Sequence, residues 1–313
     1  MMRVAEPTEG RTDGPTPLVS VVIPCFEQEA YARELLASIL AQTFADWEAI
    51  LVDDGSRTAD LGRMVRETGD ARCRVITHER NRGLGAARNT GFAAARGRLV
   101  VAVDADDLLT PSFLAVTTTA LSDPEADCAY TDFQLFGDST AVWRFEPGSP
   151  ADMLSRQWIP GPGALMRKEL WERLGGYQNL WGNEDWEFWI AAVRAGVKTI
   201  RVPAPLYLYR RTPQSMSVTS MRYHEHESRE AIYRRHRPFF DVHRAGRAFR
   251  SHGYLRGSRA ALHRRERTRA IRLAIRGVAL APASPAMART LLLAVLPHRL
   301  AKLRPEAAAG SRS

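Results

Sequence analysis

Arg98-Leu-Val-Val-Ala-Val-Asp-Ala-Asp-Asp107 sets three carboxylates within four residues, directly after an apolar run. The run predicts a buried strand at residues 98–103. Like charges this close repel one another unless a cation lies among them, and hard divalent ions prefer oxygen ligands. A solvated turn leading into the next helix would also explain these residues, because Asp is a favoured N-cap. Their position at the end of a strand favours a cation site.

Three further strands are predicted upstream, each followed by a segment with helical spacing of apolar residues. We expect these strands at residues 18–24, 47–52 and 73–77, and the helices at 30–42, 61–68 and 83–95. This alternation predicts an α/β fold with a mostly parallel central sheet and helices on both faces. Ligands bind such sheets beyond the carboxyl ends of the strands, where residues 104–107 lie.

A second acidic segment, Asp53-Asp54-Gly55-Ser56, closes the strand predicted at 47–52. A carboxylate there can accept hydrogen bonds from a nucleobase or a ribose, and Gly55 permits a tight turn. An ordinary turn between a strand and a helix would explain the same residues. Further on, Arg82 and Arg88 flank glycines at a predicted helix start, which suits anionic phosphates but also fits a solvated loop.

A third acidic segment, Glu184-Asp185-Trp186-Glu187-Phe188-Trp189, follows the turn Trp181-Gly182-Asn183. Acidic residues in the first turn of a helix interact favourably with its dipole, and that alone could explain them. The functional interpretation is a general base directed at an acceptor hydroxyl, with aromatic rings forming a platform for a sugar.

The second half of the chain has a different pattern. Strands are expected at 128–136, 141–145, 198–202 and 206–210, and helices at 168–174 and 184–195. From residue 221 onward the chain is predicted to be mostly helical and rich in arginine. Residues 1–17 are polar and rich in Pro and Gly, and are expected to form a disordered leader.

Charge is distributed unevenly along the 313 residues, whose formal net charge is +9. Residues 220–313 carry 21 Lys and Arg against 6 Asp and Glu, whereas residues 1–219 carry 23 against 29. Helices with basic faces lie on anionic membrane surfaces. A helical subdomain with solvated arginines is the alternative.

Cysteine usage and hydropathy bear on the compartment. Cys25, Cys73 and Cys128 are widely spaced and form no recognisable metal-binding or disulfide pattern, which fits a reducing, cytoplasmic location. The leader has no apolar signal core, and no run of about 18 uncharged apolar residues predicts a spanning helix. We therefore expect a cytoplasmic protein, peripheral at the inner face of the membrane if the basic region binds lipid.

Taken in order, these segments resemble the family 2 glycosyltransferases, whose fold is called GT-A. The resemblance covers about residues 19–217. It is carried by residues 21–26, by 38–56 with the ending Val-Asp-Asp-Gly-Ser, by 81–91 leading into 103–107, and by Gly175-Gly-Tyr177 followed by Asn183-Glu-Asp-Trp186. It implies a catalytic domain at 18–219, with a nucleotide-binding half at 18–110 and an acceptor-binding half at 111–219, before the helical basic region at 220–313.

The resemblance also implies an activity. Such an enzyme transfers a sugar, with inversion, from a nucleotide-diphosphate sugar to an acceptor hydroxyl, in polysaccharide, glycolipid or other glycoconjugate synthesis. The expected donor is a UDP-sugar, with dTDP and GDP open; the expected acceptor is a carbohydrate or a lipid-linked sugar. The expected cofactor is a divalent metal, Mn²⁺ or Mg²⁺.

Roles for individual residues follow from the matched positions and from the readings above. Asp185 is the expected catalytic base, and Asp104 and Asp106 are the expected ligands of the metal and the diphosphate. The remaining expected contacts are, for the donor, Pro24, Phe26, Asp53, Asp54, Arg82 and Arg88, and, for the acceptor, Trp181, Glu184 and Trp186.

Two departures and two alternatives accompany this reading. Glu27 stands where many relatives have Asn or Asp, and Thr212 where they often have His. A sugar-1-phosphate nucleotidyltransferase needs a glycine-rich basic loop after the first strand, but residues 25–29 are acidic and lack glycine. A nucleic-acid-binding protein would explain the basic region and leave the acidic strand ends unexplained, so we expect no nucleic-acid partner.

Overall fold

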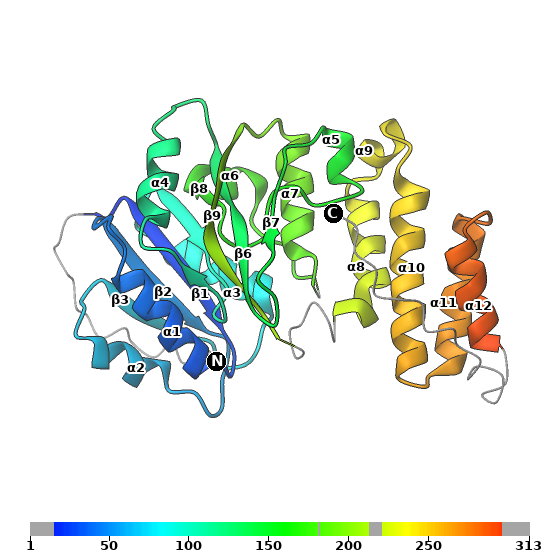
Figure 1. The fold of residues 1–313 in the computed structure, drawn as a ribbon, viewed down its shortest axis with the longest axis horizontal. Coiled ribbons are helices and arrows are strands. Elements are labelled where there is room, and N and C mark those ends of the chain that lie inside the picture. The colour runs from blue at the N-terminus through cyan, green and yellow to red at the C-terminus, as the bar shows by residue number, and fades with distance from the viewer. Residues whose placement is uncertain (1–15, 181, 213–220, 296–313) are drawn as a thin grey trace, which may run out of the picture.

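The computed structural model describes residues 16–180, 182–212 and 221–295, and it confirms the predicted α/β class (Figure 1). Nine strands form one sheet. In chain order they are β1 (Val19–Cys25), β2 (Trp47–Asp53), β3 (Cys73–Thr77), β4 (Leu99–Ala102), β5 (Leu108–Leu109), β6 (Cys128–Gly137), β7 (Val142–Trp143), β8 (Leu165–Arg167) and β9 (Thr199–Arg211).

The first four strands are parallel and lie in the order β3-β2-β1-β4, so their carboxyl ends share one edge. Cys25 at the end of β1 pairs with Asp53 of β2, and Val22 pairs with Ala102 of β4. The alternation of strands and helices predicted parallel pairing but not the strand order. The acidic segments after β2 and β4 therefore lie at the same edge of the sheet, on either side of β1.

The second half of the sheet differs from the prediction at three strands, since the short strands β5 and β8 were not predicted and β9 was predicted as two strands. β9 is a single strand from Thr199 to Arg211, where we expected two separate strands. The prolines at 203 and 205 suggested a break, since proline cannot donate a ladder hydrogen bond. Instead the pairing of β9 with β6 shifts register beside Thr131 and Asp132, and the irregularity accommodates them.

Helices cover both faces of the sheet. In chain order, the helices of the described residues, including those of the C-terminal region, are α1 (Glu29–Leu40), α2 (Leu61–Thr68), α3 (Leu84–Ala94), α4 (Phe113–Ala120), α5 (Pro150–Met153), α6 (Lys168–Leu174), α7 (Glu184–Arg194), α8 (Met221–Arg235), α9 (Arg237–Val242), α10 (Gly246–His263), α11 (Arg267–Leu280) and α12 (Pro285–Val295). One buried core includes residues of α1, α2 and α4, and the other includes residues of α3, α6 and α7.

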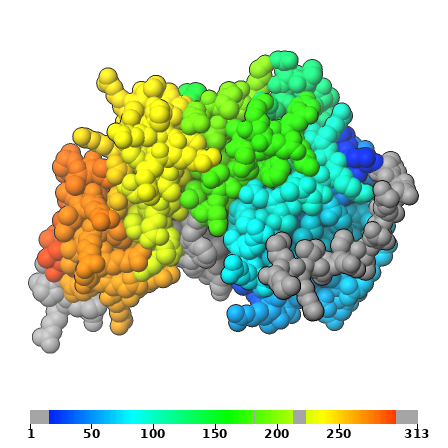
Figure 2. Space-filling model, turned by 180° about the vertical axis from the view of Figure 1, so that it is seen from behind, coloured from blue at the N-terminus to red at the C-terminus, as the bar shows by residue number. Residues whose placement is uncertain are grey.

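The C-terminal helices divide into two groups by their packing. Ile232, Phe240 and Phe249 from α8, α9 and α10 belong to the same core as α7. Helices α11 and α12 contribute to two small separate clusters. Figure 2 shows the yellow and orange helices as a block at one end of the molecule. Within the described residues, no helix is both long and apolar enough to cross a membrane.

Ion pairs and an aromatic contact fasten this block to α7. The buried Glu187 accepts hydrogen bonds from His236 Nε2 at 2.7 Å and pairs with Arg235 Nε at 2.8 Å. The Arg229 guanidinium lies 4.5 Å from the centre of the Trp186 ring. The helix that begins with Glu184-Asp185 is therefore held on its far side by the C-terminal region.

Candidate active site

Asp54, just beyond β2, holds the start of α3. One oxygen of Asp54 accepts from the Arg82 N–H at 2.9 Å and lies 2.6 Å from His78 Nδ1, while the other accepts from the Gly83 N–H at 2.8 Å. These backbone groups precede α3, where N–H groups lack helical partners. Asp54 is thus engaged by the protein, and its expected contact with a nucleobase stays a prediction.

Arg88 lies one turn further along α3 and is 1% exposed. Its Nη1 donates to Glu184 Oε1 at 2.8 Å, and its Nη2 donates to Asp104 Oδ1 at 2.7 Å. We expected Arg88 to contact donor phosphate, and that contact stays a prediction; in this structure both terminal nitrogens bind carboxylates. Arg88 thereby joins the acidic end of β4 to the start of α7, across 96 residues of sequence.

Helix α7 begins in an unusual backbone conformation. Asn183, its N-cap, has φ 116°, a region that side chains other than glycine rarely adopt, and strain of this kind clusters at functional sites. Glu184 is 3% exposed and directed at Arg88, so it does not present itself to an acceptor as expected. Burial raises the pKa of Glu184 to about 7, although the Arg88 guanidinium opposes that shift.

Asp185 is half-buried and adjoins this pair. Its Oδ2 accepts from Gln157 Nε2 at 3.2 Å, and its Oδ1 accepts from the Trp186 N–H at 2.7 Å. A Cβ on Gly161 would overlap the Asp185 carboxylate, so the turn formed by residues 160–163 contacts that carboxylate directly. The carboxylate therefore has a defined position and keeps part of its surface open.

The carboxylates after β4 occupy three different environments. Asp104 retains 26% side-chain exposure. Asp107 is buried, accepting from the Tyr207 hydroxyl at 2.7 Å and from the Arg210 N–H at 2.7 Å, and burial raises its pKa well above the usual range. Burial, followed by repulsion from Asp104, raises the pKa of Asp106 to about 6. Repulsion of this kind is relieved when a cation joins the cluster.

These donors fit a hard divalent cation that is completed by a ligand. Asp104 and Asp106 offer oxygen atoms, the ligand type that Mg²⁺ and Mn²⁺ take. The described residues hold no group of three His, Cys, Asp or Glu placed to bind a metal ion. Two protein carboxylates are typical of sites in which phosphate oxygens and water supply the remaining ligands. The residues present are therefore compatible with the expected cofactor.

The loop after β1 is partly open and partly built into the protein. Phe26 is 45% exposed at this edge and Pro24 is buried within β1, and their expected contacts with the nucleotide stay predictions. Asp53 accepts from the Ser56 N–H at 2.9 Å. Glu27, the first departure from the family pattern, accepts from the Arg57 N–H at 2.7 Å and so ties the loops after β1 and β2 together.

The aromatic platform expected for the acceptor is not formed by Trp186. Its ring is 8% exposed, packs against Phe249, and donates from Nε1 to the Met153 carbonyl at 2.7 Å. The apolar periodicity of α7 placed Trp186 on a face that the C-terminal helices cover. Trp181 lies outside the described residues. Arg82 is exposed, and its predicted contact with phosphate stays a prediction.

Several residues of this site were missed from the sequence. Gln157 and Gly161 position Asp185, Tyr207 donates to Asp107, and His78 supports Asp54. The Pro160-Gly-Pro-Gly163 run was a usable signal, because closely spaced glycines often mark a close backbone approach. The others come from strands and turns with no local pattern that indicates a site.

Helix α3 therefore brings three acidic segments together. Asp54 binds the residues before it, and Arg88 binds both Asp104 and Glu184, next to Asp185. The result is a cation-compatible carboxylate pair near a half-open carboxylate on another helix. Such an arrangement can hold an anionic leaving group on one side and accept a proton on the other.

Comparison with known proteins agrees with this geometry. Residues 20–180 match the model of "Glycosyl transferase family 2". The chain is 37% identical over 167 residues to the O-antigen biosynthesis protein RfbC of Myxococcus xanthus, covering 51% of this chain and 13% of that protein. The chain spans less than two thirds of the length of the curated relatives that it matches, from 13% to 63%.

Two solved structures share the fold. One is S. aureus TarS 1–349 in complex with UDP-GlcNAc, with a TM-score of 0.61 and 18% identity, over 88% of this chain and 79% of that one. The other is the mannosyltransferase PcManGT from Pyrobaculum calidifontis with GDP-Man and Mn²⁺, with a TM-score of 0.57 and 20% identity, over 90% and 86%. The predicted GT-A fold with a helical C-terminal region is confirmed.

Proposed function

The chain belongs to glycosyl transferase family 2, and from this premise we propose that it transfers a sugar from a nucleotide-diphosphate sugar to an acceptor hydroxyl with inversion. The observation that carries the proposal is the position of Arg88. Its two hydrogen bonds place the Asp104 end of β4 and the Glu184-Asp185 start of α7 at opposite ends of one guanidinium. The donor-binding and acceptor-activating groups of a direct displacement thereby share one site.

Asp185 is the proposed general base. Gln157 and the Trp186 N–H orient its carboxylate, and Gly161 leaves it room. The acceptor hydroxyl loses its proton to Asp185 as its oxygen forms a bond to the sugar carbon, and the bond from that carbon to the diphosphate breaks on the opposite face. Glu184 is a positioning residue, because its side chain binds Arg88.

Asp104 and Asp106 would hold the divalent metal, Mn²⁺ or Mg²⁺. When bound, the metal supplies positive charge that stabilises the departing diphosphate. Arg88 limits the movement of Asp104, and the backbone carbonyl of Asp106 accepts from Arg210 Nε at 2.6 Å. These contacts hold the Asp104 carboxylate and the Asp106 backbone in place before a donor arrives, which reduces the reorganisation needed during transfer.

The comparisons support a donor and acceptor class. UDP-GlcNAc occupies one structural neighbour and GDP-Man another, and we propose a UDP-sugar as the donor. A further relative, 30% identical over 129 residues, is the Escherichia coli "UDP-Glc:alpha-D-GlcNAc-diphosphoundecaprenol beta-1,3-glucosyltransferase WfgD". We propose a carbohydrate or lipid-linked acceptor in polysaccharide synthesis, with the C-terminal helices at the membrane surface.

A thermal-shift panel tests the donor proposal. The full chain is heated with UDP, GDP and dTDP, each with and without Mn²⁺, and we expect the largest stabilisation from UDP with Mn²⁺. At about 100 times Kd, a ligand adds about 2.7 kcal/mol to the unfolding free energy. If only GDP stabilised the protein, the donor would carry guanine instead of the proposed uracil. Equal stabilisation with and without metal would contradict the role given to Asp104 and Asp106.

Two substitutions separate the proposed roles. Asp185→Asn should keep UDP binding while transfer falls on the order of 10²–10⁴-fold, because a general base contributes about that much. Asp106→Ala should weaken metal-dependent binding as well as transfer. Asp46→Asn, at an exposed site before β2, is the matched control and should leave both unchanged. Wild-type transfer rates in Asp185→Asn would refute the assignment of the base.

A further inference from the structure

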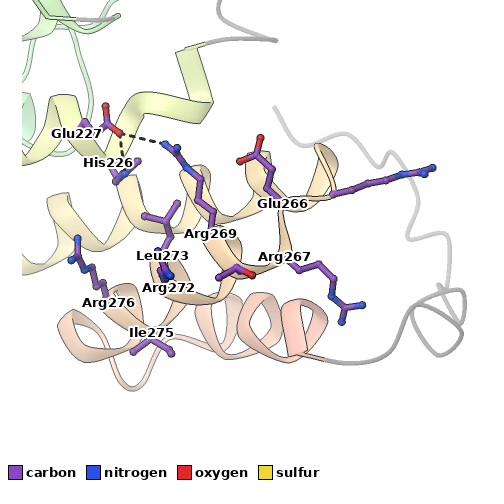
Figure 3. A pocket seen from close by; sticks show the side chains of 11 residues that line it. His226, Glu227, Glu266, Arg267, Arg269, Arg272, Leu273, Ile275 and Arg276 are labelled. Atoms are coloured by element: carbon purple, nitrogen blue, oxygen red, sulfur yellow. Dashed lines mark hydrogen bonds and ion pairs between the residues drawn. The ribbon is translucent and has the colours of Figure 1, made fainter.

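A cavity of about 980 Å³ lies between α8 and α11, in the C-terminal helices and apart from the carboxylate site. Figure 3 shows its lining, which includes His226 and Glu227 of α8 together with side chains of α11. Five arginines and two glutamates line it. The cavity therefore has an excess of positive charge, which attracts anions.

Both acids of the cavity are already engaged. Glu227 lies 3.3 Å from Arg269 Nη2, 3.0 Å from His224 Nδ1 and 3.5 Å from His226 Nε2. Glu266 accepts a hydrogen bond from the Tyr223 hydroxyl. Arg269 is thus paired with Glu227, and Glu266 is engaged by a neutral hydroxyl.

Arg272 and Arg276 carry two of the positive charges that line the cavity. Both are exposed, and among the described residues neither has a carboxylate within ion-pair distance. The two arginines are four residues apart on α11, so they lie on one side of the helix.

Ile275 lies on the same side of α11, between these arginines, and is 54% exposed. Helix α12 also exposes apolar side chains, since Leu292 is 57% and Val295 is 58% exposed. Soluble surfaces tolerate single apolar residues, but an exposed isoleucine flanked by unpaired arginines is the pattern of a helix at an anionic lipid interface.

Two buried polar atoms at the cavity lack partners within the described structure. Arg269 Nε and His226 Nδ1 have no hydrogen bond. Burial lowers the pKa of His226, and Arg269 and Arg276 lower it further, whereas Glu227 opposes the shift. An anion bound among these groups would reduce the repulsion that they now exert on one another.

We propose that this cavity binds the phosphate of an anionic lipid headgroup, so that α11 lies at a membrane surface. The proposal deepens the proposed function, because a lipid-linked acceptor is presented at such a surface. Arg272 and Arg276 are the expected phosphate contacts, and Ile275 is expected to enter the interface beside the headgroup. A free phosphate would engage the arginines but would gain nothing from Ile275.

Vesicle flotation with the full chain tests this assignment. Vesicles contain phosphatidylcholine alone or with phosphatidylglycerol, and the wild-type protein should float only with the anionic vesicles. The double variant Arg272→Gln/Arg276→Gln should bind about 25-fold more weakly, since each arginine near an anionic surface contributes about fivefold. Ile275→Ser should weaken binding by a smaller factor. High salt should weaken all binding.

A matched control removes the same charge elsewhere. Arg66 and Arg98 are exposed, have no described carboxylate partner and lie in the sheet region, and Arg66→Gln/Arg98→Gln should float like wild type. Equal loss in this control, or full binding by Arg272→Gln/Arg276→Gln, would overturn the proposal. A third result would also overturn the proposal: the wild type does not float with vesicles, yet inorganic phosphate raises its melting temperature and leaves that of the double variant unchanged. The ligand would then be a free anion.

These outcomes do not depend on sugar transfer. Flotation requires no donor and no turnover, and the UDP and Mn²⁺ thermal shift reports on the carboxylate site alone. A chain that binds UDP with metal yet ignores anionic vesicles would refute the lipid site and leave the proposed activity standing. A chain that floats with anionic vesicles but binds no nucleotide would refute the proposed activity and leave the lipid site standing.

Discussion

Arginine has opposite environments in the two halves of this molecule. Arg88 is 1% exposed and donates to Asp104 and Glu184, so its charge is balanced inside the protein. Arg272 and Arg276 are exposed on α11 and have no carboxylate partner among the residues described. The difference indicates that arginine residues have two separate roles in this protein. Arg88 fixes internal geometry, while Arg272 and Arg276 are the proposed contacts of an external anion.

The largest expected effect comes from removing the internal charge. Arg88→Met should lower the unfolding free energy by about 3–5 kcal/mol, because Glu184 and Asp104 would lose their buried partner. The corresponding fall in melting temperature is roughly 10 °C. Transfer should fall as well, since the start of α7 is no longer tied to the end of β4. Thermal unfolding followed by circular dichroism, with a transfer assay, measures both.

Arg272→Met is the matched change in the other region. It removes an exposed, unpaired arginine, and such substitutions usually change stability by no more than about 0.5 kcal/mol. Equal destabilisation by Arg88→Met and Arg272→Met would break the comparison, because it would show that the charge of α11 is also neutralised within the fold.

A smaller effect is expected from Gly161→Ala. The added methyl group would overlap the Asp185 carboxylate and displace it, and small overpacking changes cost about 1–3 kcal/mol. We expect the transfer rate to fall about 10- to 100-fold while UDP binding is kept, because misplaced catalytic groups lose rate steeply. Steady-state kinetics that show raised KM at unchanged kcat would contradict this position for Asp185.

The smallest effect concerns pH and the basic cavity. Burial lowers the pKa of His226 below its ordinary value, so between those two pKa values the unfolded chain binds more protons than the folded chain. Stability should therefore decrease as the pH falls below about 6.5. In His226→Gln, the unfolding free energy measured in urea should decrease less than in the wild type between about pH 7.5 and about pH 5.5. Identical slopes for both proteins would contradict the assignment.

The first half of the fold could be predicted because its signals are local. Continuous apolar runs gave β1, β2 and β4, and the acidic residues after β2 and β4 marked the shared edge. The second half was harder. β8 has three residues and β5 has two, too short for a periodic signal, and the prolines in β9 suggested a break that a register shift absorbs.

The candidate site shows the same limit. Sequence patterns identified Asp104, Asp106 and Asp185 as candidates, and the structure links their segments through Arg88. The patterns could not assign Arg88, Glu184 and Trp186, because burial depends on partners far away in the chain. Glu184 lies 96 residues from Arg88, and the ring that covers Trp186 belongs to Phe249.

The contacts of Glu187 decide how the protein can be divided for study. A fragment that ends before α8 would lose Arg235 and His236, leaving a buried carboxylate unneutralised on the helix that carries Asp185. It would also uncover the apolar surface where Phe240 and Phe249 now pack. The smallest independently folding unit therefore extends at least through α10, and the family's matched segment, residues 20–180, is shorter than that unit.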